Sequence, residues 1–258
     1  MVYSKKLGKE FNKISKAYEK GRLDYPPKLI NGILKNLKLG KGDKILDVGC
    51  GNGRSTLPFA KKGYNILGID PGKDLISLAR KKSKGFDNVK YQVSSFENFK
   101  SKPRIFNVIL FGTSFHWVKE KGIYKKINLL LKDNGYLVIF YGFSNSDKSK
   151  LFSEIVKICK KHCPNHPNLK SSTRTKKILT NISKSHLFFK PKKLSFVKYN
   201  YFSKKEYINL LNSYSFVSSL DNNSKKALFD DLEKVFNKHR GRIKIPFDYI
   251  IILAKKKS

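Results

Sequence analysis

The sequence predicts an α/β fold, in which helices cover both faces of a mainly parallel sheet. Three observations predict it. Short apolar runs alternate with helix-like stretches along the first half of the chain, a glycine-rich turn follows the first of these runs, and 258 residues are enough to bury a full core. Strands that alternate with helices indicate βαβ units, because parallel neighbours need a long crossover between them.

The first 142 residues supply most of this alternation. We expect residues 3–38 to form two helices with a break at Pro26-Pro27, and residues 40–43 to form a turn. Five strands are expected at 44–48, 64–69, 89–93, 106–111 and 135–141. The helices between these strands are expected at 54–62, 72–82 and 119–132.

The pattern changes after Gly142. Helices are expected at 147–162, 174–189, 204–213 and 224–238, with one strand at 194–202 and a last strand at 247–254. We therefore divide the chain into three parts. These are a sheet core with N-terminal helices (1–142), a helical cap and substrate region with one strand (143–246), and the last sheet strand with a lysine-rich tail (247–258).

The chain is strongly basic, with 55 Lys and Arg against 19 Asp and Glu and a formal net charge of +36. A surplus of this size suits polyanionic partners such as nucleic acid. Only seven of the basic residues are Arg, however, and the lysines are spread along the whole chain. Because Arg is the residue that reads phosphate and base edges with a fixed geometry, this composition favours solvated lysine faces, and nucleic acid stays an open alternative.

Other classes of protein are disfavoured by what the sequence contains. No apolar run is long enough for a membrane span, and the first residues lack the apolar stretch of a signal peptide. We therefore expect a soluble, cytoplasmic protein without a membrane partner, acting as a monomer or homodimer. Three cysteines are too few for a disulfide framework.

One cluster has the residue types of a zinc site, in the order Cys159, His162, Cys163, His166. Pro164 interrupts the helix that would align these side chains, and four ligands within eight residues leave little chain to wrap an ion. We predict no metal here.

The most informative stretch is KILDVGCGNGRSTL, residues 44–57, where a strand leads through glycines into a helix. Glycines in such a turn let bare backbone N–H groups and the positive helix end approach a ligand. The dinucleotide pattern G-x-G-x-x-G would need a glycine where Arg54 stands, and Asp47 would repel a pyrophosphate. A carboxylate there suits a cationic ligand that carries an amino group.

The run Asp47–Gly53 resembles motif I of the class I S-adenosylmethionine (SAM)-dependent methyltransferases, and further family motifs follow in order. They are Gly68-Ile69-Asp70, Ser95-Phe96-Glu97, Phe111–Trp117, Leu131–Tyr136 and an N-terminal signature carried by Phe11, Ala17, Tyr18, Arg22, Tyr25 and Pro26. Together they cover about residues 10–142. The chain looks most like the trans-aconitate methyltransferase-like (methyltransferase type 11) subgroup. This resemblance implies a Rossmann-like, doubly wound sheet of seven strands, mostly parallel with one antiparallel strand, plus a helical cap.

The resemblance also implies SAM as cofactor and S-adenosylhomocysteine as product. The residues it assigns to the cofactor are Asp47, Gly49, Cys50, Gly51, Gly53, Asp70, Pro71, Ser95, Phe96, Glu97 and Phe111. Asp70, at a strand end, would accept the ribose hydroxyls, although it could instead cap the helix after Pro71. Glu97 would lie beside the adenine edge, or be a solvated loop acid.

For the acceptor, the resemblance points to His116 and Trp117, which follow the fourth strand, where open α/β sheets keep their ligands. Tyr18 and Arg22 lie four apart and share one helical face. Arg22 could contact the cofactor's carboxylate, hold an acidic substrate or form a surface ion pair.

We expect methyl transfer to a small-molecule acceptor, with a carboxylate as one option because it is anionic at neutral pH and needs no base. A hydroxyl acceptor would need a base, for which His116 is the candidate. Two alternatives stay open: an RNA or DNA methyltransferase, and a noncatalytic SAM-binding or nucleic-acid-binding protein on the same fold. The sequence shows no base-flipping motif of the N/D-P-P-Y/F type.

Overall fold

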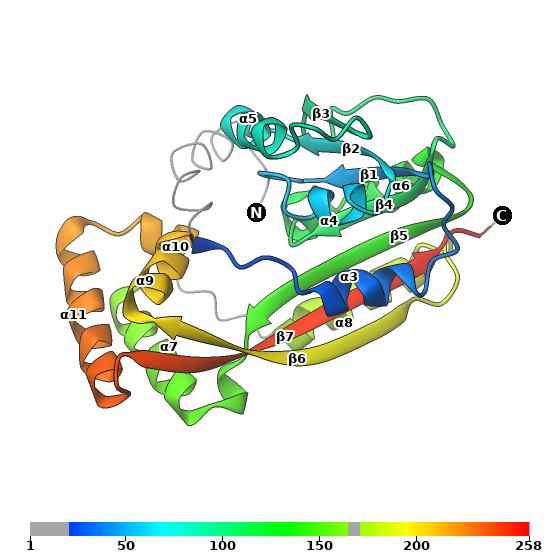
Figure 1. Ribbon diagram of the computed structural model, residues 1–258. Helices are drawn as coiled ribbons and strands as arrows, with labels where there is room; N and C mark the ends of the chain where they lie inside the picture. Colours follow the sequence, from blue (N-terminus) through cyan, green and yellow to red (C-terminus); the bar gives the residue numbers. More distant parts are fainter. Residues whose placement is uncertain (1–20, 165–170, 258) are drawn as a thin grey trace.

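The computed structural model describes residues 21–164 and 171–257, which form one seven-stranded sheet with helices on both faces (Figure 1). The strand order is β3-β2-β1-β4-β5-β7-β6. The strands are β1 (Lys44–Val48), β2 (Asn65–Asp70), β3 (Val89–Val93), β4 (Phe106–Gly112), β5 (Leu131–Ser144), β6 (Lys192–Ser203) and β7 (Arg242–Lys255). β7 runs antiparallel to both of its neighbours, and the other adjacent pairs are parallel. The predicted fold class is confirmed.

The helices of the first half lie close to their predicted places. They are α3 (Pro27–Leu34), α4 (Thr56–Ala60), α5 (Lys73–Lys82), the 3₁₀ turn η1 (Phe115–Trp117) and α6 (Ile123–Leu130). α4 is shorter than expected because the glycine-rich turn takes the residues before it. α6 is shorter than expected at both ends, since Gly122 precedes it in a left-handed conformation and β5 follows it at once.

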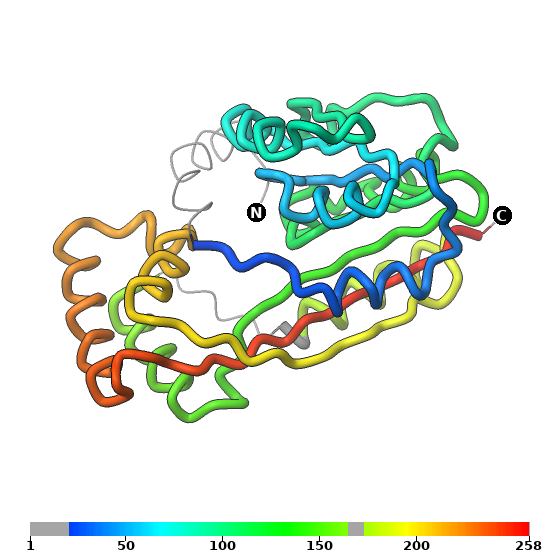
Figure 2. The backbone as a smooth tube through the Cα atoms, viewed as in Figure 1, coloured from blue at the N-terminus to red at the C-terminus, as the bar shows by residue number. Residues whose placement is uncertain are grey.

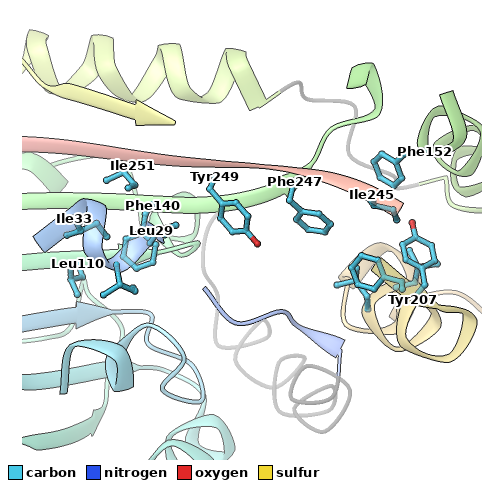
Figure 3. Packing of buried hydrophobic residues seen from close by; sticks show 14 of the residues in the cluster. Leu29, Ile33, Leu110, Phe140, Phe152, Tyr207, Ile245, Phe247, Tyr249 and Ile251 are labelled. Atoms are coloured by element: carbon cyan, nitrogen blue, oxygen red, sulfur yellow. The ribbon is translucent and has the colours of Figure 1, made fainter. Parts of the chain in front are cut away.

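Two layers of apolar side chains cover the two faces of the sheet. On one face, Leu29 and Ile33 of α3 pack in the same cluster as Phe140 of β5 and Ile251 of β7. Figure 3 shows this cluster continuing along β7 through Tyr249, Phe247 and Ile245 to Phe152 and Tyr207 at the far end. A single apolar layer therefore joins the sheet to the helices beyond its end.

The region predicted as a cap contributes more than a group of helices. α7 (Lys150–His162), α9 (Lys204–Asn212), α10 (Ser215–Ser218) and α11 (Asn222–Lys238) gather at one end of the long strands (Figure 1). α8 (Ser171–Lys184) instead covers the second face of the sheet, where Ile178 and Ile182 pack in the same cluster as Ile127 of α6. β6 is the edge strand of the main sheet.

The last strand begins at Arg242, earlier than the expected start at 247. Ile243 and Ile245 are buried on one side of the early part, and this part pairs with β6. A proline is unfavourable in a central strand because it removes a ladder hydrogen bond. Pro246 is tolerated because β7 pairs with β5 only from Phe247 onward.

The segment 21–26 connects the two ends of the molecule, running from α9 and α10 to α3 (Figure 2). Its contact with the helices is close: a Cβ on Gly21 would lie 2.0 Å from the carbonyl oxygen of Asn209. The predicted N-terminal helix with Tyr18, and His166 of the Cys/His cluster, lie outside the described residues. Within the described ranges, no helix combines the length and apolarity that crossing a membrane requires.

Candidate functional site

The glycine-rich turn after β1 lies at the carboxyl end of the sheet and is held close to its neighbours. The backbone N–H groups of Gly49 and Cys50 donate to the carbonyl of Ile69, at 2.8 and 3.1 Å. Gly49 has φ +68°, and a Cβ there would lie 2.5 Å from Cβ of Ser114. Only glycine fits this conformation and this close approach, so the turn leaves its backbone bare.

Asp70 ends β2 and joins two turns. Its Oδ2 accepts a hydrogen bond from the N–H of Gly51 at 3.0 Å, and its Oδ1 accepts from the N–H of Gly72 at 2.7 Å. Burial raises the pKa of Asp70 to about 6, while these two hydrogen bonds act in the opposite direction. A carboxylate has about four lone-pair sites, so each oxygen can still accept from a ligand hydroxyl.

The first cavity opens beside these two groups and encloses about 620 Å³ of empty space, which includes space open to solvent. Seven of the predicted cofactor residues line it: Gly49, Gly51, Asp70, Pro71, Ser95, Phe96 and Glu97. Trp117, predicted for the acceptor, lines the same cavity. The cavity therefore gathers turns that follow β1, β2, β3 and β4.

A lysine holds the loop that carries Phe96 and Glu97. Nζ of Lys126, on α6, donates to the carbonyls of Phe96, Glu97 and Phe99 at 2.6, 3.0 and 2.7 Å. Burial lowers the pKa of Lys126, and the charge of Glu97 acts in the opposite direction. Three charge-assisted bonds to carbonyls of one loop fix its shape. Glu97 itself accepts from the N–H of Lys119 at 2.9 Å.

Asp47 lies behind the glycine-rich turn and lines neither cavity described here. It is 0% exposed, and its Oδ2 accepts hydrogen bonds from the hydroxyls of Ser55 and Thr56, both at 2.7 Å. Within the described part of the chain its Oδ1 has no hydrogen-bond partner. Burial raises the pKa of Asp47 to about 6, and the charge of Asp70 adds to this while the two hydroxyls oppose it. A cation near Oδ1 would stabilise the ionised form.

The second cavity adjoins the first, and the two share Gly49, Gly112 and Thr113. It encloses about 660 Å³ of empty space, which also includes space open to solvent. Its further lining residues are Arg22, Leu23, Asp24, Tyr25, Cys50, Asn52, Arg54, Ser55, Gly142, Leu210, Tyr214, Phe247 and Tyr249. These residues come from the segment 21–26, the glycine-rich turn, β5, α9, the link after α9, and β7. Figure 3 shows Tyr249 and Phe247 side by side on β7.

Two guanidinium groups give the second cavity a positive character. Nη2 of Arg22 donates to the carbonyl of Ser213 at 3.2 Å, and its guanidinium carbon lies 4.3 Å from the ring centroid of Tyr214. Arg54 pairs with Asp24 at 3.0 Å; the Arg54 side chain is 12% exposed and that of Asp24 is 91% exposed. A buried guanidinium with a solvated partner can still contact a second anion.

Thr113 lies at the junction of the two cavities in an uncommon backbone conformation. Its φ is +58°, a region that β-branched residues rarely adopt. Its Oγ1 shares a hydrogen bond of 2.8 Å with the hydroxyl of Tyr25, and its N–H donates to the carbonyl of Phe140. Strained residues of this kind cluster at functional sites.

The remaining predicted residues lie around the cavities rather than in their walls. The ring of Phe111 is buried and meets those of Phe96 and Phe115 edge-on, at 5.8 and 5.0 Å between centroids. Gly53 packs against α5, with 3.5 Å between a Cβ built on it and Cβ of Ala79. His116 is exposed beside Trp117. Partial removal from water, with the positive charges of Arg174 and Arg22, lowers the pKa of His116, so its ring is neutral at pH 7.

Sequence reasoning missed several residues of the second cavity. Asn52 and Arg54 belong to the glycine-rich stretch 44–57, and this position indicates that they lie beside the candidate ligand site. Tyr25 belonged to the N-terminal signature. Tyr214 and Tyr249 carry no local signal, because only the folded chain brings them beside the turn after β1.

The described residues of the Cys/His cluster, Cys159, His162 and Cys163, pack in the core or hydrogen-bond to a neighbouring helix. Cys159 and Cys163 are buried in the apolar layer, and burial raises the pKa of the Cys159 thiol to about 12, with the neighbouring Cys163 adding to the shift. Nε2 of His162 shares a hydrogen bond of 2.9 Å with Asp231 of α11. Among the described residues, no group of three His, Cys, Asp or Glu side chains is arranged to hold a metal.

Comparison with known proteins bears directly on this site. A family model described as a methyltransferase domain matches residues 39–212, which include every turn that lines the first cavity. The chain belongs to this methyltransferase domain family. The prediction of a class I SAM-dependent methyltransferase is confirmed.

Individual relatives of this methyltransferase chain agree over part of their length. An uncharacterized methyltransferase of Schizosaccharomyces pombe is 26% identical over 141 residues, 54% of this chain and 55% of the relative. The ubiquinone biosynthesis O-methyltransferase of Pelagibacter ubique is 34% identical over 117 residues, 42% of this chain and 48% of the relative. The chain spans about half the length of the curated relatives it matches. The crystal structure of the YcgJ protein from Bacillus subtilis shares the fold, with a TM-score of 0.59, 13% identity, and 89% of this chain and 98% of that chain covered.

The residues of this methyltransferase fit SAM. The bare turn around Gly49 lets a ligand approach the backbone closely, and Asp70 has lone pairs for ribose hydroxyls. The loop that Lys126 holds places Phe96 and Glu97 in the wall of the same cavity.

Proposed function

We propose that the protein transfers the methyl group of SAM to an anionic small molecule, with a carboxylate as the favoured acceptor, bound in the second cavity. One observation carries this proposal: Arg22 and Arg54 line a cavity that adjoins the cofactor cavity at Gly49, Gly112 and Thr113. Two guanidinium groups are well suited to hold carboxylate or phosphate oxygens.

The residues of the chain have separate tasks in this proposal. SAM supplies a methyl group on a positively charged sulfur, which is transferred to a nucleophile in line with the carbon–sulfur bond. Asp70 holds the ribose, and Phe96 and Glu97 flank the adenine. Arg22 and Arg54 bind the acceptor, while the aromatic wall of Tyr214, Phe247 and Tyr249 excludes water. Alignment and water exclusion are the main contributions of such a site.

A carboxylate acceptor is ionised at neutral pH, so no residue has to remove a proton from it. This agrees with the lining of the second cavity, in which no His is found among the described residues. For a hydroxyl acceptor, His116 stays the predicted base because it lies next to Trp117 of the first cavity. Its lowered pKa makes its ring a weaker proton acceptor than an ordinary histidine, which favours the carboxylate acceptor.

The comparison with relatives supports a small acceptor. The relative from Pelagibacter ubique is named for ubiquinone biosynthesis, whose acceptor is a small molecule. The alternative of a nucleic-acid acceptor rests on the charge of +36 alone. A protein that contacts 6–10 phosphates loses on the order of 10³–10⁵ in affinity between 50 and 200 mM salt, whereas steering of a small anion changes only modestly.

The test is methyl transfer from radiolabelled SAM, first to a pool of small metabolites and then to RNA and DNA, at 50 and 200 mM salt. We expect label in methyl esters of small anionic acceptors at both salt concentrations. Arg22→Gln and Arg54→Gln should raise the acceptor KM by about 10- to 100-fold and leave S-adenosylhomocysteine affinity within about threefold. Arg104→Gln, which changes an exposed arginine paired with Asp133, is the matched control. Label only in nucleic acid would overturn the proposal.

A further inference from the structure

The edge strand β6 exposes a row of apolar side chains on one of its faces (Figure 1). Of the six exposed large apolar side chains in the described part of the chain, three lie on β6, namely Val197 (39% exposed), Tyr199 (47%) and Tyr201 (59%). Successive residues of a strand point to opposite faces, so these three share one face, and we refer to them as the β6 row. Phe196 and Phe202, on the other face, pack with the core. Single exposed apolar residues are ordinary on a protein surface, but a continuous row indicates a contact surface.

The β6 row lies on the face of the sheet opposite the second cavity. In the register of β6 with β7, Tyr201 pairs with Lys244, which therefore shares its face. Phe247 and Tyr249 of the second cavity are an odd number of residues from Lys244, so they point to the other face. On the face of the row, the apolar cluster that includes α8 reaches β7 only from Ile250 onward. The two tyrosine rings are thus left uncovered.

Positive charge surrounds the β6 row. Nζ of Lys244 lies 4.6 Å from the ring centroid of Tyr199 and 5.6 Å from that of Tyr201. Residues 190–205 contain six lysines, and residues 234–247 contain three lysines and two arginines, and neither segment contains Asp or Glu. Because the strands β6 and β7 lie side by side, these cations gather at one end of the sheet edge and attract an anionic partner.

Flat rings together with cations select one kind of partner. Rings at alternate positions of a strand lie about 7 Å apart and offer neighbouring platforms for flat groups. The bases of single-stranded nucleic acid stack on such rings whatever their sequence, while cations neutralise the phosphates between them. The bases of a duplex are already stacked on one another, and an anionic lipid headgroup has no flat ring to place there. A second copy of this chain carries the same positive charge, which opposes pairing of two β6 edges.

We propose that the face of β6 and β7 around Tyr199, Tyr201 and Lys244 binds single-stranded nucleic acid, with the two rings stacking on bases and Lys244 contacting a phosphate. Asp248, farther along β7 on the same face, is paired with Lys148 at 2.6 Å, so its charge is balanced. Since the sheet separates this face from the second cavity, the bound strand is not the methyl acceptor. The protein is held on a nucleic acid while its cavities stay open to small molecules.

The test is fluorescence anisotropy with a labelled oligothymidylate of about 16 nucleotides, at about 50 and 200 mM salt. Tyr199→Ala and Tyr201→Ala should each weaken binding by about 5- to 100-fold, because each removes one stacking platform. Tyr201→Phe keeps the ring and should stay within about threefold of wild type. Lys244→Gln should reduce the slope of log affinity against log salt concentration by about 0.7, which corresponds to one phosphate contact on a single strand.

Two matched controls change the same kinds of side chain elsewhere. Phe189→Ala removes a ring that is 51% exposed outside the β6 row. Lys90→Gln removes an exposed lysine from β3, the opposite edge strand of the sheet. Both should leave oligothymidylate affinity within about twofold of wild type. Tm and S-adenosylhomocysteine affinity should stay close to wild type in the Tyr201 variants, because this side chain is exposed and lines neither cavity.

Each other result overturns the proposal. Equal affinity for oligothymidylate and duplex DNA, unchanged in Tyr201→Ala, would mean attraction to charge alone. Binding to vesicles of anionic phospholipid that Tyr201→Ala abolishes, with oligothymidylate binding unchanged, would assign the face to a membrane surface. Wild-type dimers in sedimentation that Tyr201→Ala dissociates would assign it to a second copy of the chain. Transfer of label from SAM to the bound oligonucleotide would contradict the separation of this face from the acceptor cavity.

Discussion

The two cavities share three lining residues but are assembled in different ways. The first is lined by residues between Val48 and Val118, which lie at the carboxyl ends of β1, β2 and β4 and in the segments that follow β1 to β4. The second joins residues from Arg22 to Tyr249, which come from the segment 21–26, the turn after β1, the ends of β4 and β5, α9 with the link after it, and β7. The first cavity depends on short-range turn geometry, and the second depends on the whole chain being folded. Changes to the two should therefore have different consequences.

The largest expected effect concerns Asp70 in the first cavity. Asp70→Ala removes the proposed ribose contacts and also the acceptors for the N–H groups of Gly51 and Gly72. We expect a loss of about 1–3 kcal/mol in S-adenosylhomocysteine affinity and a lower Tm, because buried donors lose their partners. Calorimetry and thermal unfolding measure the two effects. Wild-type affinity in a folded variant would take Asp70 out of the site.

The loop behind the first cavity should be nearly as sensitive. Lys126→Met keeps most of the side-chain volume but removes three bonds to the carbonyls of the loop that carries Phe96 and Glu97. We expect a loss of about 1–3 kcal/mol in unfolding free energy and weaker cofactor binding. The control is Lys125→Met, at an exposed neighbouring position. Equal effects of the two changes in denaturant unfolding would show that these bonds contribute nothing specific.

Removing the charge of Asp47 should raise the unfolding free energy, whereas the changes at Asp70 and Lys126 should lower it. Burial raises its pKa from the ordinary 3.8 to about 6, so the folded protein holds the proton more tightly than the unfolded chain does. The stability attributable to this group therefore falls as the pH rises from about 4 to 6. Asp47→Asn removes this titration, and without cofactor the variant should be more stable than wild type at pH 7.5 by on the order of 1–3 kcal/mol.

The control for Asp47→Asn is Asp87→Asn, which changes an exposed aspartate. The stability difference between Asp47→Asn and wild type should narrow below about pH 4, where the wild-type carboxyl is protonated in both states. Denaturant unfolding across this pH range measures it. An Asp47→Asn variant less stable than wild type at pH 7.5 would show that the ionised carboxylate stabilises the fold, contrary to this expectation.

The smallest expected effect concerns the hydrogen bond between Tyr25 of the second cavity and Thr113, which both cavities share. Tyr25→Phe and Thr113→Val each remove one hydroxyl of the pair that links the N-terminal segment to the end of β4. A double-mutant cycle on unfolding free energy should give a coupling of about 0.5–1.5 kcal/mol. Affinity for S-adenosylhomocysteine should change little. Additive effects would mean that the two hydroxyls act independently.

The contrast between the two cavities also explains which parts of the structure could be predicted from the sequence. The bounds of β1 and β3 agree with those predicted from the sequence, because each is a short run of strand-forming residues bounded by turn residues. Many residues of the first cavity could be predicted because the motifs that contain them follow one another in order along the chain. The start of β7 was missed because Pro246 is unfavourable in a central strand, and its tolerance depends on where the pairing with β5 stops. The left-handed backbone of Thr113 had no signal in its residue type.

The position of β7 between β5 and β6 also bears on how the protein is made. Synthesis proceeds from the amino end, so the turns of the first cavity leave the ribosome well before β7 does. Tyr249 and Phe247 are among the last side chains of the sheet to be added, and β6 can pair only once they arrive. A nascent chain can thus have its cofactor half in place while it still lacks the wall that confines an acceptor. Under the proposed function, methyl transfer would then begin only after the carboxyl-terminal strand has paired in the sheet.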